Sequence, residues 1–384
     1  MGWPTKKLGE LADICRGSSP RPISDTRFFD GGTVPWIKIA DATKSGKFLY
    51  KTKQHVNDFG ASFSRRLPPG TILVAASGTL GYTQILGVEG CAHDGWLILQ
   101  NLRELDRDFA YYALKTLEQH FFNSASGAAI QNINTDILRE AEIPYPPIYI
   151  QQRISGILSS YDDLIENSQR RIKILEEIAR GLYREWFVRF RFSGHEGHPY
   201  VSSALGEIPL GWGVKKVKDI LTRRPAGNAY RDVDVKQQGE VPVIDQSTSE
   251  LLGYHDNEPD HWASADVPMA IFGDHTCKMQ VVLEPFSVGP NVVPFTARDD
   301  MPTAYVFYAV KSLIQTQEYK RHWTLLNSKE VVIADKATAR RFAALIKPLL
   351  EMQETHRKAI LNLRRTRDIL LPRLLSGQID VENR

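Results

Sequence analysis

The sequence predicts a mixed α+β fold with two similar globular domains, each followed by a long helix, and with the two helices pairing as an intramolecular antiparallel coiled coil. Three observations predict it: an internal duplication, a heptad pattern at the end of each copy, and β-branched segments bounded by glycine and proline in the rest. The chain has 384 residues, of which 42% are hydrophobic and 24% are charged. Length and composition therefore fit two or three folded domains.

The duplication is visible as matches that keep the same order in both halves. The matching residues are Trp3, Lys6, Lys7, Leu8 and Leu11 with Trp212, Lys215, Lys216, Val217 and Ile220; Val34 and Pro35 with Val241 and Pro242; and Tyr112, Ala113 and Lys115 with Tyr308, Ala309 and Lys311. Residues 154–187 then match residues 342–375 without a gap. The interval between partners falls along the chain, so the two copies have the same order of elements and different loop lengths.

The long helices are predicted from apolar residues that alternate four and three positions apart over about five heptads. The seam residues are Ile154, Leu158, Tyr161, Ile165, Ile172, Leu175, Leu182 and Trp186 in the first copy, and Phe342, Ile346, Leu349, Ile360, Leu363, Leu370 and Leu374 in the second. Each stripe needs a partner, and the domain between the helices can return the chain antiparallel. A helix over residues 154–190 is about 55 Å long at ~1.5 Å per residue, so we interpret it as a spacer.

Polar residues interrupt the second seam. Gln353, His356 and Arg367 stand where the first copy has Ile165, Ser168 and Ala179. Polar residues at seam positions typically fix register and partner choice at a cost in stability. We interpret His356 in this way, with no metal-binding or catalytic role.

The remaining segments predict strand-rich domains. Residues 34–40, 71–76, 267–272 and 287–295 are expected to be strands, and residues 109–122 and 303–319 helices. The predicted organisation is a first domain at 1–150, a central spacer helix at 151–191, a linker at 192–211, a second domain at 212–338, a C-terminal spacer helix at 339–376 and a tail at 377–384.

Charge and composition exclude several classes of protein. The net charge is only +3, and residues 339–384, with 10 basic and 5 acidic residues, form the one distinctly basic segment. The apolar runs are too short for a membrane span, so we expect a soluble, cytoplasmic protein. Cys15, Cys91 and Cys277 are scattered without a CxxC pair, which predicts neither a zinc site nor a disulfide framework.

No catalytic motif is recognisable. The sequence has no GxGxxG or FxGxG turn and no GxxxxGK[ST] loop, so no cofactor is expected in this chain. The stretch Pro144-Tyr145-Pro146-Pro147 lacks the Asn or Asp of an amino-methyltransferase motif, and no nucleophile elbow surrounds Ser77, which rules against a triad with His93 and Asp94. The pairs His255-Asp256 and Asp274-His275 have no supporting metal ligands. We predict no catalytic, cofactor or metal site.

Three segments carry a family resemblance. Residues 67–86 (LPPGTILVAASGTLGYTQIL), 91–99 and 126–154 (SGAAIQNINTDILREAEIPYPPIYIQQRI) closely resemble the target-recognition domain of type I restriction-modification specificity subunits. The Pro-rich corner that leads into the long helix in this family is matched by Ile143, Pro144, Pro146, Pro147 and Gln152. The domain-helix-domain-helix order extends the resemblance to the whole chain. The second domain departs from it, with residues 331–334 at the corner and Asp274-His275-Thr276 where the first domain has Ser77-Gly78-Thr79.

The resemblance implies a non-catalytic, sequence-specific DNA-binding subunit that reads a bipartite, asymmetric target. It also implies two modification (methyltransferase) subunits that hold S-adenosylmethionine, and restriction (translocase/endonuclease) subunits that use ATP. The spacer length agrees with two readers about one DNA turn, or roughly 34 to 36 Å, apart. Two alternatives remain open: an autonomous DNA-modifying enzyme, and a coiled-coil protein adaptor without DNA binding.

Candidate DNA-binding residues are polar or basic and lie on expected loops, because such side chains read base edges. They are Lys38, Lys44, Lys47, Lys51, Lys53, Ser77, Thr79, Tyr82, Gln131 and Asn132 in the first domain, and Asp274, His275, Lys278, Lys320, Arg321, His322 and Asn327 in the second.

Overall fold

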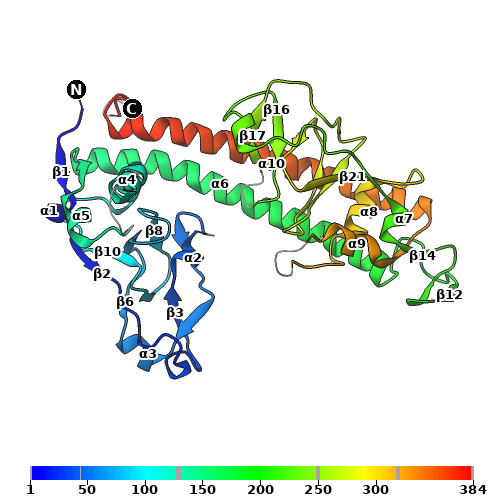
Figure 1. Ribbon diagram of the computed structural model, residues 1–384, viewed down its shortest axis with the longest axis horizontal. Coiled ribbons are helices and arrows are strands. Elements are labelled where there is room, and N and C mark those ends of the chain that lie inside the picture. Colours follow the sequence, from blue (N-terminus) through cyan, green and yellow to red (C-terminus); the bar gives the residue numbers. More distant parts are fainter. Residues whose placement is uncertain (1, 44, 127–131, 248–250, 317–320, 382–384) are drawn as a thin grey trace. The chain divides into compact units, whose positions relative to one another are not determined.

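A computed structural model of the chain describes residues 2–43, 45–126, 132–247, 251–316 and 321–381. The chain forms two compact units, the first made of Met1–Asn167 with Ala359–Arg384 and the second of Ser168–Lys358. Each unit holds one β-rich domain and part of both long helices, α6 (Ile148–Tyr183) and α10 (Lys336–Leu375) (Figure 1). The predicted mixed α+β class, with two β domains each followed by a long helix, is confirmed.

The domain of the first unit is built on two sheets and a short ladder. The five-stranded sheet has the order β2 (Asp13–Arg16), β10 (Trp96–Gln100), β7 (Ile72–Ala75), β8 (Thr83–Leu86), β4 (Phe48–Leu49); the four-stranded sheet has the order β5 (Gln54–Val56), β3 (Val34–Ile37), β9 (Gly90–Ala92), β6 (Arg65–Leu67); and β1 (Thr5–Lys7) pairs with β11 (Glu142–Pro144). The helical segments are α1 (Leu8–Leu11), η1 (Thr26–Phe28), α2 (Ile39–Ala42), α3 (Asp58–Ser62), α4 (Arg107–Ser126) and α5 (Thr135–Glu140). β7 and β8 are buried along their whole length, which explains their continuous apolar character.

The domain of the second unit has a related set of elements. Its four-stranded sheet has the order β15 (Leu221–Arg223), β21 (Val292–Ala297), β18 (Met269–Gly273), β19 (Met279–Val282). Its three-stranded sheet has the order β17 (Leu251–His255), β16 (Val241–Ile244), β20 (Ser287–Val288). Two further strand pairs are β14 (Gly213–Lys216) with β22 (Glu330–Ile333) and the hairpin β12 (Tyr200–Ser203) with β13 (Gly206–Pro209). The helical segments are α7 (Val217–Ile220), η3 (Asp232–Asp234), α8 (Thr303–Val310) and α9 (Trp323–Ser328).

The predicted duplication is present in the strand pairing of the two domains. The order β2-β10-β7-β8 corresponds to β15-β21-β18-β19, and β5-β3-β9 corresponds to β17-β16-β20. In both smaller sheets the middle strand, β3 or β16, is antiparallel to one neighbour and parallel to the other. The two copies therefore share topology as well as sequence order.

The two long helices pair antiparallel, as predicted. In the first unit Ile154 and Leu158, near the start of α6, share a core with Leu374 and Leu375 at the end of α10. In the second unit the ring of Phe187, which follows α6 in the π-helical turn Arg184–Val188, lies 5.1 Å from the ring of Phe342 near the start of α10. Within each unit, Figure 1 shows the stretches of α6 and α10 lying side by side.

Several elements differ from the expectation. The helix predicted over 303–319 ends at Val310. The strand predicted over 287–295 is broken into β20 and β21, because Gly289-Pro290 begins a turn in which Asn291 takes a φ of 60°. The segment 192–211, expected to be a linker, contains the hairpin β12–β13, and the ring of Phe192 lies 5.2 Å from that of Trp212.

Candidate nucleic-acid interface

Loops that follow four strands of the first domain converge on one place. The N–H of Ser18, after β2, donates to Ala92 O at 3.1 Å, and the N–H of Ala76, after β7, donates to Gly95 O at 2.8 Å. The N–H of Ile133 donates in turn to Ala76 O at 2.9 Å. We call this region loop cluster 1, made of residues 16–21, 38, 76–79, 93–95 and 132–133.

Gly17 is required for the close approach of these loops. A Cβ atom at this position would lie 2.2 Å from His93 O, far inside van der Waals contact with backbone. The sequence Gly17-Ser18-Ser19-Pro20 therefore serves the packing of the loops as well as the turn.

Three cations gather around His93 in loop cluster 1. Arg16 Nε donates to Asp94 O at 2.7 Å, and the Arg21 guanidinium forms an ion pair with the Asp94 carboxylate. Lys38 Nζ lies 4.4 Å from the centroid of the Trp36 ring, and that ring lies 5.4 Å from the His93 ring. Burial lowers the pKa of His93, and Lys38, Arg21 and Arg16 lower it further against the opposite effect of Asp94. The imidazole is therefore neutral at pH 7, and the cluster carries an excess of positive charge.

Ser77, His93 and Asp94 come near one another without the geometry of a catalytic triad. His93 Nδ1 accepts the N–H of Gly95 at 2.9 Å and lies 3.0 Å from Asp94 Oδ1. Because it accepts from Gly95, this nitrogen does not carry the proton that a triad histidine donates to its aspartate. The carboxylate of Asp94 also forms an ion pair with Arg21. Loop cluster 1 therefore presents basic and uncharged polar side chains together.

Those predicted DNA-binding residues of the first domain that the structure describes fall into two groups. Lys38, Ser77, Thr79 and Asn132 lie in loop cluster 1. The second group lies outside it and consists of Lys47, Lys51, Lys53 and Tyr82. Lys51 and Lys53 are exposed between β4 and β5. The Tyr82 hydroxyl donates to Ala42 O at 3.1 Å, and burial raises the pKa of this phenol. Lys44 and Gln131 lie outside the described residues.

Lys47 has a structural contact in place of the solvent-facing position that the sequence suggested. Its side chain is 7% exposed, and Nζ lies 2.7 Å from Asp108 Oδ1 and donates to Ser159 Oγ at 2.7 Å. Asp108 belongs to α4 and Ser159 to α6, so Lys47 joins the domain to the long helix within the first unit.

Sequence analysis missed Arg16, Arg21 and Arg65. Arg16 and Arg21 flank the turn-forming stretch Gly17-Ser18-Ser19-Pro20, and Arg65 Nε donates to Arg16 O at 2.8 Å. Basic residues on both sides of a Gly- and Pro-containing turn were the available signal. The pairing of β6 with β9, which brings Arg65 here, is not readable from spacing.

The second domain gathers several of its predicted residues in a corresponding region, loop cluster 2, made of residues 245–247, 274–278 and 321–323. The N–H of His322 donates to Asp274 O at 2.9 Å, and the N–H of His275 donates to Gln246 Oε1 at 3.1 Å. Lys278 Nζ donates to Asp245 O at 2.9 Å and to Ser247 O at 2.7 Å. These bonds hold the loops together.

The other predicted residues of the second domain differ in exposure. His322 is buried, Arg321 is exposed, and Asn327 is half-buried in α9. Lys320 lies outside the described residues.

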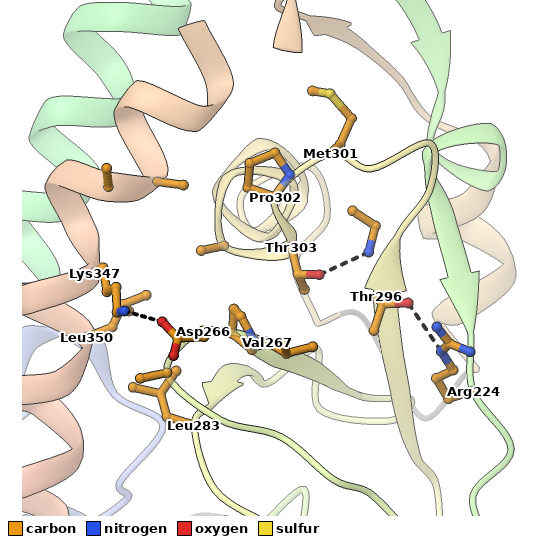
Figure 2. A pocket seen from close by; sticks show the side chains of 16 residues that line it. Arg224, Asp266, Val267, Leu283, Thr296, Met301, Pro302, Thr303, Lys347 and Leu350 are labelled. Carbon is orange, nitrogen blue, oxygen red and sulfur yellow. Dashed lines mark hydrogen bonds and ion pairs between the residues drawn. The ribbon is translucent and has the colours of Figure 1, made fainter. Parts of the chain in front are cut away.

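A cavity of about 410 Å³ in the second unit lies between the domain and α10. Figure 2 shows Lys347 of α10 facing Asp266, with 2.5 Å between Nζ and Oδ1, and Arg224 Nε donating to Thr296 Oγ1 at 3.2 Å. The described residues that line it include no histidine or cysteine, Lys347 and Asp266 form an ion pair, and Arg224 is hydrogen-bonded to Thr296. We assign this cavity to packing between the domain and the helix.

Other candidate sites have structural partners. His255 Nε2 lies 2.9 Å from Ser287 Oγ, and Asp256 forms an ion pair with Lys236 at 2.8 Å. Within the described ranges, no group of three or more potential metal ligands is found. In the same ranges, every helix is too short or too polar to cross a membrane.

Comparison with known proteins shows which class of protein the chain resembles. A family model described as the type I restriction modification DNA specificity domain matches residues 1–177. A type I restriction enzyme specificity subunit of Methanocaldococcus jannaschii is 26% identical over 99% of this chain and 94% of its own length. A putative type I specificity subunit of Mycoplasma genitalium is 31% identical over 55% of this chain and 51% of its own.

The fold agrees with a solved structure. The crystal structure of a type I restriction-modification S subunit from M. genitalium matches with a TM-score of 0.59 and 18% identity, covering 97% of this chain and 96% of that one. The family model and the relatives agree in describing specificity subunits of type I restriction-modification systems. The chain resembles these proteins in sequence and shares its fold with one of them.

Proposed function

We propose that this specificity subunit reads a bipartite, asymmetric DNA target, with one half-site for each domain and with α6 and α10 setting the distance between the half-sites. The recognition domains at 1–150 and 212–338 and the spacer helices at 151–191 and 339–376 belong to this proposal. Its support is a shared topology with different polar residues at corresponding loops, Ser77-Gly78-Thr79 and Asp274-His275-Thr276. Two copies of one frame with different side chains are expected to read different bases.

The observation that carries the proposal is the convergence of Arg16, Arg21 and Lys38 on loop cluster 1. Arginine and lysine bind phosphates, and arginine also reads guanine by two parallel hydrogen bonds. Uncharged donors and acceptors on Ser77 and Thr79 lie in the same cluster and add base-edge chemistry. Lys47 is left out of the proposed contact surface because its ammonium group is buried against Asp108.

Replacing Arg21 by Ala in the host strain tests this surface. We expect methylation to be lost or relaxed at the first half-site, because a good base contact contributes about 1 to 3 kcal/mol of discrimination. Arg103→Ala is the matched control, because Arg103 is also an exposed arginine in an ion pair. Its partner Asp13 begins β2, whereas loop cluster 1 lies at the other end of this strand, after Arg16. Sequencing of methylated motifs reads both variants.

The outcomes separate the kinds of contact. A relaxed base preference in one half-site supports base reading by Arg21, whereas weakened methylation of all sites, with a flatter salt dependence, indicates a phosphate contact. Unchanged methylation in Arg16→Ala, Arg21→Ala and Lys38→Ala variants would show that loop cluster 1 is not the DNA surface.

We further propose that the chain holds two modification subunits, which bind S-adenosylmethionine, and recruits restriction subunits, which bind ATP. This role puts the chain in the cytoplasm with the host DNA. The isolated chain is expected neither to methylate DNA with S-adenosylmethionine nor to cut it with ATP, and to support methylation once the modification subunit is added. Methyl transfer by the chain alone would favour an autonomous enzyme, and an absence of salt-dependent DNA affinity would favour a protein adaptor.

A further inference from the structure

The two long helices are copies of one another, so each helix contact in one unit has a counterpart by sequence in the other unit. Ile154 in the first copy corresponds to Phe342, and Phe187 corresponds to Leu375. Ile154 shares a core with Leu375 in the first unit, and Phe187 packs on Phe342 in the second unit. A contact at one end of the pair therefore has a defined counterpart at the other end.

One such contact in the first unit is a largely buried ion pair. Arg367 of α10 lies 2.5 Å from the carboxylate of Asp162 on α6, and the two side chains are 20% and 14% exposed. The Tyr112 hydroxyl of the first domain donates to the second oxygen of Asp162 at 2.5 Å. Both carboxylate oxygens thus have a partner, and Arg367 supplies the only positive charge among them.

The counterpart of this ion pair in the second unit is apolar. By the same correspondence, Asp162 matches Leu350 and Arg367 matches Ala179. Leu350 and Ala179 are both buried in the core that joins α6, α10 and the second domain. The same position of the pair is charged in one unit and apolar in the other.

A second acidic residue of α6 also interacts with a basic residue of α10. Glu176 of α6 forms an ion pair with Lys311. Burial alone would raise the pKa of Glu176, but Lys311, Arg180 and Arg357 of α10 outweigh it and hold the pKa below its usual value. The α6 residues Asp162 and Glu176 are acidic, and the α10 residues Arg367 and Arg357 that act on them are basic.

We infer that the Asp162–Arg367 pair selects α10 of the same chain as the partner of α6, against α6 of a second copy. The duplicated seams would otherwise allow α6 to pair with α6 and α10 with α10 in a closed two-fold dimer. In an α6·α6 pair each Asp162 faces Ala179 of the other copy and loses its arginine. In an α10·α10 pair each Arg367 faces Leu350 and keeps the carboxylate of Asp368, its neighbour on the same helix, but not that of Asp162. Both mispairings separate the largely buried Asp162 and Arg367 charges from each other, which is strongly unfavourable.

The test removes the asymmetry within the full chain. Asp162→Leu combined with Arg367→Ala makes the first-unit contact identical to the one in the second unit. Two differently tagged copies are unfolded together and refolded, and the copy captured by the other tag is measured along with molecular mass by light scattering. We expect the mixed-copy dimer to rise by at least about tenfold over the unsubstituted chain.

A charge reversal is the matched control. Asp162→Arg combined with Arg367→Asp changes the same two residues and keeps one opposite-charge pair, so it is expected to stay monomeric. If the symmetrised chain is as monomeric as the unsubstituted one, or if the reversed chain dimerises equally, the pair does not select the partner.

A second experiment covers the case in which the symmetrised chain fails to fold. One copy carries Asp162→Arg alone and the other carries Arg367→Asp alone, so each has like charges within its own helix pair. When the two are refolded together, exchanged α6·α10 pairs restore an opposite-charge contact at both places. A mixed dimer that exceeds the dimer formed by either copy alone supports the inference, and equal yields overturn it.

Discussion

At the scale of single residues, Lys47 illustrates a cation used for folding rather than for a ligand. Replacing it by Met keeps the apolar stem and removes the charge, while the Asp108 carboxylate keeps its ion pair with Arg107. We expect a loss of about 2 to 3 kcal/mol in the free energy of unfolding, because a largely buried carboxylate loses its main partner. Urea unfolding followed by circular dichroism measures it. Lys51→Met, at an exposed position, should change stability by less than about 0.5 kcal/mol.

The same ion pair has a predictable pH dependence. Burial alone would raise the pKa of Asp108, but Lys47 and Arg107 outweigh it and hold this pKa below the ordinary value of 3.8. A carboxyl group whose pKa is lowered by folding stabilises the protein above its unfolded pKa, and this contribution is lost as the pH falls through the folded pKa. The stability difference between the unsubstituted chain and Lys47→Met should be constant near neutral pH and shrink below about pH 4. A difference that persists in acid would mean that the effect comes from packing.

At the scale of elements, the contribution of a residue of α6 to stability depends on whether its side chain is buried against α10 and the domain. Leu158 of α6 is fully buried in the core that joins α6, α10 and the first domain, whereas Leu164 of the same helix is 51% exposed. Leu158→Ala should destabilise the protein by roughly 2 to 5 kcal/mol through lost burial and a cavity, and Leu164→Ala by much less. Thermal and urea unfolding of the two variants compare the same substitution at both positions. Equal losses would place the α6 seam on a different face from the one described.

The elements also show what sequence can predict. The heptad pattern and the Pro146-Pro147 corner predict α6 well, because side-chain period and backbone restriction are local properties and the helix begins at Ile148. The heptad pattern predicts Leu349 as a seam residue of α10, but Leu350 is more deeply buried. The reason is that α10 packs against the second domain as well as against α6. Asp162 was not assigned to the seam because a carboxylate has no place in an apolar pattern unless its partner, Arg367, is known.

The candidate site was predicted only in part, for a related reason. Lys38, Ser77, Thr79 and Asn132 were found because polar residues after strands are local signals. The buried position of Lys47 depends on Asp108 and Ser159, which are distant in sequence.

At the scale of the whole molecule, two copies of one frame with different loops suggest that recognition and spacing are separable. The proposed readers are loops of the domains, while the proposed spacing depends on α6 and α10. Inserting four residues into both helices, between Ser168 and Ile172 and between His356 and Ile360, tests this separation. Four residues add about 6 Å and about one turn, so the apolar seam stays nearly in phase.

With the inserted chain, the modification subunits should methylate a target whose two half-sites keep their bases and are separated by about two more base pairs, since the rise per base pair is roughly 3.4 Å. Inserting two residues at the same places is the control: it rotates the following seam by about 200°, so the helices should no longer pair and methylation should be lost. Sequencing of methylated motifs reads both variants. Altered half-site bases at unchanged spacing would show that the helices do not set the distance. A longer helix pair can move a recognition domain along DNA, but it has no contact through which to change the bases that the domain reads.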